Sequence, residues 1–480
     1  MEAYQETSLL KSLALRQLSK FLCRHRQEWA HHMPDLETFE RELHAHLLAF
    51  ECELLTEELA HYDVEAERIT VNGVVYRQAM EETERYMTSA GEVVVKRHLY
   101  RPAGRSSRHI CPLELQAGIV EGFFTPVAAR RAAYVVAHMP PATGAALFVE
   151  LGNMQPSASS LARLPKELSA RWEAHRQEWE AHLRTFEDVP PEATTLVVSL
   201  DGVLAPIRNT APDRAELEAT EKQPKGPKGY QEVGCGTVSL HDVEGERLQT
   251  VRYGRMPESK KATLCEELEA EVQAILAMRP HLRVVKLADG ARDNWRFLRA
   301  LNLGVPAGQI ESWDIVDYYH ACDHLKHALD TIWGEHTPKG KAEFARLKTL
   351  LKEADNGVER VIETLRYRVR KAKGHKRDVL LKEVTYFRNQ RHRMHYAAYL
   401  RENLPIASGV VEAACKTLVT QRLKQSGMRW TKPGGQAILT LRSLIQSERW
   451  ERGWALLREN YQQSILVDMA DTYFALPLAA

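Results

Sequence analysis

Apolar positions change their spacing along the chain, and the change separates a helical front from a mixed α/β middle. Residues 1–67 carry leucine and phenylalanine at helical spacing. Two apolar runs, 68–76 and 92–100, predict strands on either side of a short helix. Residues 113–187 return to helical spacing. The first part of the chain is therefore expected to be mainly helical, with a small β element inside it.

The helical stretch near residue 150 has the segmentation of a small DNA-binding domain. Two predicted helices, Pro126–His138 and Pro141–Leu151, are followed by a third that begins at Ser157. The third segment would be the reading helix of a helix-turn-helix. Pro165 is expected to cut this segment short, since proline breaks helix interiors. A plain helical bundle fits the same pattern equally well.

Two apolar runs in the middle of the chain each stop at an Asp-Gly pair. Thr194–Leu200 ends at Asp201, and Leu282–Ala288 ends at Asp289. Such β-branched runs predict buried strands that carry a carboxylate to the rim of a sheet. Asp-Gly is also a common turn dipeptide, so one instance alone would indicate only a turn.

The order of predicted elements after residue 190 is three strands, a helix, a strand, a helix and a strand. This order is typical of an RNase H-like mixed sheet, in which the first strand lies beside the strand after the first helix. We therefore expect an RNase H-like core with a basic helical insertion, behind a mainly helical DNA-binding region. The expected boundaries are 1–67 (helical), 68–112 (small α/β element), 113–190 (helical, helix-turn-helix or bundle), 191–334 (first part of the core), 335–402 (basic helical insertion), 403–450 (final core helix with Glu412) and 451–480 (C-terminal helix and tail).

Composition indicates an ordinary soluble protein in a reducing compartment. The 480 residues are 44% hydrophobic and 27% charged, which predicts more than one domain. The start of the chain is polar, and no apolar run reaches 18 residues, so we expect a cytoplasmic protein without a membrane partner. Seven scattered cysteines without a CxxC fit free thiols, and no zinc is expected.

A net charge of +1 conceals an uneven distribution. Residues 35–67 hold eleven acids and one base, whereas residues 338–400 hold seventeen Lys and Arg against seven acids. Residues 416–432 hold five bases and no acid. Such blocks are either solvated helix faces or surfaces for a polyanion, and the second interpretation favours DNA or RNA.

Three carboxylates carry the predicted chemistry. Asp201 and Asp289 would be neighbours in the expected sheet, and two carboxylates that close keep both charges only with a cation between them. Glu412, on a helical stretch, supplies a third acid. Oxygen ligands without a His/Cys cage favour two Mg²⁺ or Mn²⁺ ions and phosphoryl transfer. Ser199 stands where a haloacid-dehalogenase-type phosphatase has its nucleophilic Asp, which argues against that alternative.

Histidines and basic residues near these acids are further candidates. His320, His324 and His327 share a helical stripe, either as surface histidines or near the active carboxylates, where His320 would act. Lys416 would pair with Glu412 or hold a phosphate. Trp430 is either packed or stacked on a DNA base. The predicted DNA-binding residues are Lys416, Arg422, Lys424, Arg429, Trp430, Arg391 and Arg393.

At these residues the chain resembles bacterial insertion-sequence transposases of the DDE type, most closely the insertion-sequence Kra-four family. The matching segments are Val198–Val203, Gly234–Ser239, Leu287–Arg292 with Asn294 and Trp295, Asp314–His320, Ser408–Lys416, Arg422–Trp430, Leu441 with Arg442, and, in the front, Tyr100–Pro102 and Cys111–Glu114. The resemblance implies Asp201, Asp289 and Glu412 as the metal-binding triad. It also implies that Asp317 and His320 form the D-x-x-H element of Mutator-related transposases. A cysteine-rich zinc ribbon after Tyr100 is missing, since only Cys111 is present.

The expected function is a DNA transposase that binds terminal inverted repeats, cuts with two metal ions and joins the ends to target DNA. The partners would be double-stranded transposon and target DNA at the bacterial nucleoid, with a homo-oligomer in the synaptic complex. Two alternatives remain open from the residues: a catalytically silent DNA-binding protein derived from a transposase, and an RNase H-like nuclease without strand transfer.

Overall fold

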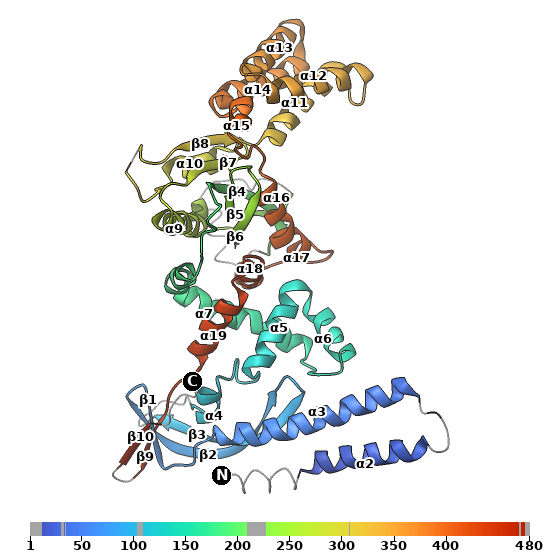
Figure 1. Cartoon of the computed structure of the whole chain (residues 1–480), viewed down its shortest axis with the longest axis vertical. Helices are drawn as coiled ribbons and strands as arrows, with labels where there is room; N and C mark the ends of the chain where they lie inside the picture. Colours follow the sequence, from blue (N-terminus) through green and yellow to red (C-terminus); the bar gives the residue numbers. More distant parts are fainter. Residues whose placement is uncertain are drawn as a thin grey trace. The chain divides into compact units, whose positions relative to one another are not determined.

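The computed structural model describes residues 12–29, 33, 35–102, 109–208, 227–306, 308–469 and 472–475. The chain forms two compact units (Figure 1). The first comprises Met1–His175 with Glu451–Ala480, and the second comprises Arg176–Trp450. Among the described residues, no helix has the length and apolar character needed to cross a bilayer.

The first unit contains a five-stranded antiparallel sheet to which both ends of the chain contribute. Its strands, in the order β10-β9-β1-β2-β3, are β10 (Thr472–Ala475), β9 (Leu466–Met469), β1 (Arg68–Val71), β2 (Val74–Met87) and β3 (Glu92–Pro102). The short helix predicted before residue 92 is wrong, because that segment belongs to β2. From Tyr76 to Met87 this strand pairs with β3, with one irregularity at Ala79, and this tertiary pairing outweighs its helix-favouring Glu and Met residues.

Helices make up the rest of the first unit. They are α2 (Leu13–Glu28), α3 (Leu36–His61), α4 (Pro112–Ala117), α5 (Pro126–His138), α6 (Pro141–Glu150) and α7 (Ala158–Thr185), which continues into the second unit. Pro165 does not end α7, contrary to the prediction. Ser157 starts this helix by accepting the Ser160 amide at 3.1 Å. The helix thus tolerates the loss of one backbone donor within 28 residues.

The second unit is built on a mixed five-stranded sheet, which confirms the predicted mixed α/β architecture. The strand order β6-β5-β4-β7-β8 joins β6 (Arg247–Arg255), β5 (Tyr230–His241), β4 (Thr195–Pro206), β7 (Arg283–Ala288) and β8 (Ser312–Val316). The first three strands are antiparallel neighbours, whereas β7 and β8 run parallel to β4. Apolar side chains of α9 (Ala262–Met278) and α10 (Arg292–Ala300) share the core with these strands.

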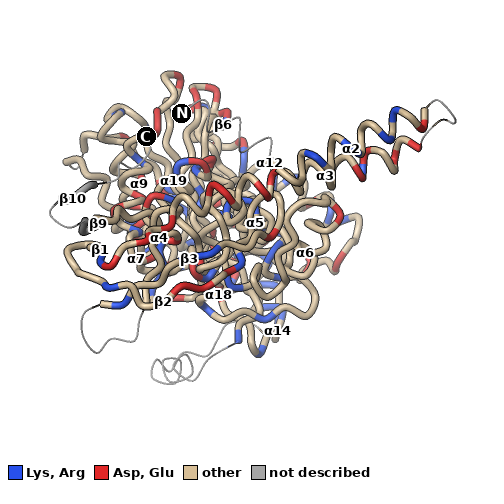
Figure 2. The backbone as a smooth tube through the Cα atoms, turned by 90° about the horizontal axis from the view of Figure 1, so that it is seen from below, with Lys and Arg blue, Asp and Glu red and all other residues tan. Residues whose placement is uncertain are grey.

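Helices follow the last strand of this sheet. They are α11 (Tyr318–Trp333), α12 (Pro338–Glu353), α13 (Gly357–Lys371), α14 (Gly374–Gln390) and α15 (Tyr396–Arg401). Basic residues lie along α14 (Figure 2). The chain then returns to the sheet through α16 (Gly409–Ala414), a π-helical segment (Cys415–Thr420), α17 (Gln421–Leu423) and α18 (Lys432–Gln446), and continues into α19 (Trp450–Tyr461).

Candidate active site

Three aspartates lie in one row across the parallel strands of the second sheet. The pairing of β4 with β7 reaches Ser199 opposite Leu287, two residues before Asp201 and Asp289. The pairing of β7 with β8 reaches one residue before Asp289 and one before Asp317. Residues at the same level of neighbouring strands point to the same face, so the register places the three aspartates at one end of the sheet. Among the described residues, however, the ligand atoms within 4.8 Å of one another are those of Asp317, His320 and Glu412, and the predicted set of Asp201, Asp289 and Glu412 is not gathered that closely. Asp317 belongs to this row because it directly follows β8, which pairs with β7.

Asp201 is the partly buried member of this row within β4. Its Oδ1 accepts the Gly202 amide at 2.7 Å, and the Cys415 thiol lies 3.6 Å from its Oδ2. Burial raises the pKa of Asp201 above its ordinary value, and the neighbouring Asp289 carboxylate raises it further. A carboxylate in this position is costly to ionise without a compensating cation.

The Asp289 carboxylate is oriented by α10. Its Oδ1 accepts hydrogen bonds from the Ala291 amide at 3.0 Å and from the Asn294 side chain at 3.1 Å. Asn294 also donates to the Leu200 carbonyl at 3.2 Å, so this one amide ties β4 to the end of β7. The Trp295 indole N–H donates to the Asp289 carbonyl at 2.5 Å. Sequence reasoning missed this positioning role for Asn294 and Trp295.

Asp317, His320 and Glu412 form a second cluster with ligand atoms within 4.8 Å of one another. Asp317 is fully buried at the start of α11, where its Oδ1 accepts the His320 amide at 2.6 Å. Its Oδ2 accepts the Ser408 amide, and the Ser408 hydroxyl donates to Glu412 at 2.8 Å. This chain of contacts connects α11 to α16. It holds the exposed Glu412 next to the buried acid of the row.

A π-helical segment follows Glu412 directly. Residues 415–420 adopt it between α16 and α17, and such turns are uncommon and frequent at functional sites. The predicted ion pair between Lys416 and Glu412 does not occur, although both residues are among those described. Glu412 instead accepts from Ser408, one turn earlier. Lys416 is left exposed beside the candidate site.

The predicted DNA-binding side chains fall into exposed and buried groups. The exposed ones are Lys416, Lys424, Arg429 and Arg391. Arg422 is buried, with its guanidinium carbon 5.1 Å from the centre of the Trp430 ring, and burial lowers its pKa to about 10. Trp430 is half-buried, and its indole N–H donates to the Leu423 carbonyl at 3.0 Å. Arg393 is equally buried, so the expected contact with DNA on the open surface fits neither Arg422 nor Arg393.

The histidine stripe of α11 is shared between two surroundings. His320 lies at the Asp317–Glu412 cluster. His324 and His327 instead contact Glu383 of α14, with Nδ1–carboxylate distances of 2.6 and 2.8 Å. The ring of His324 also stacks on Tyr386 at 3.6 Å between centroids. These two histidines therefore fasten α14 to α11.

Replacing Glu383 by Gln should destabilise the fold in a pH-dependent way. Burial alone raises the pKa of Glu383, but the hydrogen bonds from His324 and His327 outweigh it and lower the pKa. A carboxyl whose pKa is lowered on folding adds stability above its unfolded pKa and loses it as the pH falls through its folded pKa. We expect Glu383→Gln to lower the free energy of unfolding at pH 7 by on the order of 1 kcal/mol.

Urea unfolding at pH 7 and at pH 3.5 measures this effect. The difference between Glu383→Gln and wild type should shrink at the lower pH. Glu363→Gln, on the exposed part of α13, is the matched control and should have no effect at either pH. A pH-independent loss in Glu383→Gln would contradict the charged interaction.

The residues present suit a divalent cation. Asp201 has a raised pKa beside Asp289, and such a like-charge pair is relieved by a cation. Separately, Asp317, His320 and Glu412 offer three donor atoms that lie within reach of one ion. Carboxylates as the main donors are typical of sites for hard cations. The fold and the site together define a mixed α/β protein with a carboxylate cluster where parallel strands meet a helix.

Comparison with known proteins adds little to this geometry. No family model matches the chain, and no curated protein matches it. Among solved structures, the chain has a weak likeness to the Drosophila P element transposase strand transfer complex. The two share 13% sequence identity, with 71% of this chain and 81% of the other covered, at a TM-score of 0.26. A likeness of this size defines neither fold nor function, so the site itself has to carry the functional conclusion.

Proposed function

We propose that this chain is a bacterial insertion-sequence transposase of the DDE type, of the Kra-four family that its motifs resemble. This proposal rests mainly on the row of Asp201, Asp289 and Asp317 at the same level of three neighbouring strands. Glu412 is linked to Asp317 through hydrogen bonds made by Ser408. We further propose that the second sheet is an RNase H-like core. Its strand order, with three antiparallel strands followed by two parallel ones, supports this assignment.

Asp201, Asp289 and Glu412 would hold two Mg²⁺ or Mn²⁺ ions, with His320 and Asp317 beside them. When bound, such ions stabilise the attacking and leaving oxygens of a phosphodiester displacement. Asn294 would keep the Asp289 carboxylate in place, and Ser408 would do the same for Glu412. These two are positioning residues.

The reaction would run as two displacements at phosphorus. Water first attacks the phosphodiester at the element's end, and the broken P–O bond leaves a 3′-hydroxyl. That hydroxyl then attacks a phosphodiester of the target DNA, forming a new bond and releasing a 3′-hydroxyl there. Exposed Lys416, Lys424, Arg429 and Arg391 would contact the phosphates of both DNAs. A homo-oligomer at the nucleoid would hold the two ends together.

Cleavage of the DNA that flanks the reading frame of this protein tests the proposed function. The DNA on both sides of the reading frame is labelled and incubated with the full chain in Mg²⁺ or Mn²⁺. We expect nicks at inverted repeats, followed by joining of precut ends to a plasmid. Cleavage without joining would identify a nuclease instead of a transposase. Binding without any cleavage in either metal would overturn the enzymatic assignment and leave a DNA-binding protein.

A further inference from the structure

A basic cavity lies between α10 and α14, next to the acidic row. Its volume is about 660 Å³. Among the described residues that line it, none is acidic and five are basic: Arg292, Arg296, Arg299, Lys382 and Arg393. Such a single-sign lining attracts anions.

Most of this positive charge has no partner within the protein. Arg292, Arg299 and Lys382 are exposed and form no hydrogen bond or ion pair with any described residue. Within the described part of the chain, Arg296 has one ion-pair partner, Asp293, at 3.4 Å on an exposed surface. Exposed pairs of this kind contribute little and are easily exchanged. The cavity therefore offers several charges that a bound anion would neutralise.

Arg393 gives the cavity a buried donor. The residue is 1% exposed, and its guanidinium carbon lies 3.8 Å from the centre of the Trp295 ring. Nη1 donates to Gln390 at 2.6 Å, and Nε lies 3.5 Å from an Asp314 oxygen. Nη2 has no hydrogen-bond partner among the described residues. A buried guanidinium donor left without an acceptor is costly, and a phosphate oxygen would satisfy it.

Two residues that line the cavity also contact or adjoin Asp289 of the acidic row. Trp295, which lies against Arg393, donates its indole N–H to the Asp289 carbonyl. Gly290, the next residue, also lines the cavity, and its carbonyl accepts from Gln390 of α14 at 3.2 Å. Tyr386 packs so closely on Gly290 that a side chain there would clash with its ring. An anion bound in the cavity would thus lie close to Asp289, where we propose that the DNA strand is cut.

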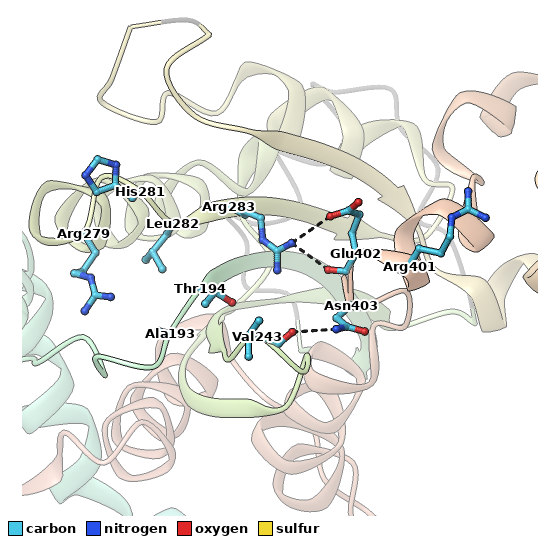
Figure 3. A pocket seen from close by; sticks show the side chains of 10 residues that line it. All are labelled: Ala193, Thr194, Val243, Arg279, His281, Leu282, Arg283, Arg401, Glu402 and Asn403. Carbon is cyan, nitrogen blue, oxygen red and sulfur yellow. Dashed lines mark hydrogen bonds and ion pairs between the residues drawn. The ribbon is translucent and has the colours of Figure 1, made fainter.

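A second cavity of the same unit makes a useful contrast (Figure 3). It has a volume of about 540 Å³ and lies at the start of β4 and β7, away from the acidic row. Its arginines are engaged by the protein: Arg283 with Glu402, Arg401 with Asp355, and Arg279 with the Pro191 carbonyl. Both cavities carry arginines, but those of the second cavity are paired and an acid, Glu402, lines it as well, whereas the cavity between α10 and α14 has basic side chains without partners among the described residues.

We infer that the cavity between α10 and α14 binds backbone phosphates of the DNA strand that enters the acidic row, with Arg393 as its buried donor. The inference rests on the proposed function, since DNA supplies the phosphates. A free nucleoside triphosphate would offer the same chemistry. The open rim of arginines along α10 favours a continuous strand, which can neutralise several charges in sequence.

Binding of a fluorescein-labelled duplex with a single-stranded overhang tests the inference. The measurement is made with the full chain in EDTA, so that no cleavage is needed. The variant is Arg292→Gln with Arg299→Gln, and Arg401→Gln in the second cavity is the matched control. Arg292 and Arg299 are both exposed, and circular dichroism checks that the double variant retains the fold. Arg393→Lys keeps the charge but removes the guanidinium donors.

The double variant should bind more weakly, and its slope of log affinity against log salt should fall by about one to two. Arg401→Gln should behave as wild type, and Arg393→Lys should also weaken binding. An unchanged slope in the double variant would overturn the inference. If millimolar ATP displaces the labelled DNA from wild type but not from the double variant, the cavity binds a free nucleotide and the inference that it binds DNA phosphates is wrong. A chain that shows the slope change but cuts no DNA would reject the proposed reaction and leave the cavity's role intact.

Discussion

Replacing Asp201 by Asn should abolish metal-dependent DNA cleavage while leaving DNA binding unchanged. The amide keeps the size of the side chain but removes the charge that would hold a cation together with Asp289. Loss of a shared ligand in a phosphoryl-transfer site is expected to cost roughly a thousandfold or more in rate. The lost charge is partly buried within β4, so the exposed cations that we propose contact DNA are untouched.

The measurement compares single-turnover cleavage and gel-shift affinity for the same labelled DNA. Glu412→Gln should show the same separation of cleavage from binding, since its carboxylate is exposed at the edge of the row. Asp293→Asn is the matched control, because Asp293 is an exposed acid of α10 whose one ion-pair partner among the described residues is Arg296. Cleavage at the wild-type rate by Asp201→Asn would remove this residue from the site.

The largest stability effect is expected at Arg449. Its side chain is 2% exposed and reaches Glu180, Glu187, Glu271 and Tyr253. These partners come from α7, the segment after it, α9 and β6, so one guanidinium joins four parts of the second unit. Burial opposes the charge, but the carboxylates and Tyr253 raise the pKa of Arg449 above its ordinary value.

Arg449→Met would remove the shared ion-pair partner of three buried carboxylates and leave Glu271 with the longer contact to Arg184 at 3.8 Å. Breaking a buried ion pair from one side typically costs about 3–5 kcal/mol, and we expect a loss of that order in the free energy of unfolding. Urea unfolding followed by circular dichroism measures it. Arg401→Met, which removes an exposed pair with Asp355, should change the unfolding midpoint by no more than the experimental error. Equal midpoints for the two variants would mean that the buried network adds no stability.

Local patterns in the sequence predicted the parts of the site that depend on single elements. The apolar runs before Asp201 and Asp289 are long and β-branched, and both form strands. The expected end of the first strand at Asp201 is wrong, because β4 runs on to Pro206 and stays paired with β5 over these residues. The parallel pairing of β4 with β7 also agrees with the predicted neighbourhood of the two acids. The roles of these acids in catalysis remain predictions.

The rest depends on contacts between distant segments, which local patterns do not encode. Asn294 bridges two strands only because α10 packs beneath them, and Asp317 joins the row only through the register of β8. The burial of Arg422 against Trp430 likewise has no local signal, since arginine is usually exposed. In the first unit, pairing with β1 turns residues expected as a C-terminal tail into β9.

Binding of Mn²⁺ to the full chain, followed by electron paramagnetic resonance without DNA, tests the central claim most directly. The account predicts that wild type binds Mn²⁺ in competition with Mg²⁺ and that Asp201→Asn and Glu412→Gln each weaken this binding, whereas Asp293→Asn does not. Wild-type Mn²⁺ binding that is absent, or unchanged in both of the first two variants, would contradict a metal centre at these carboxylates.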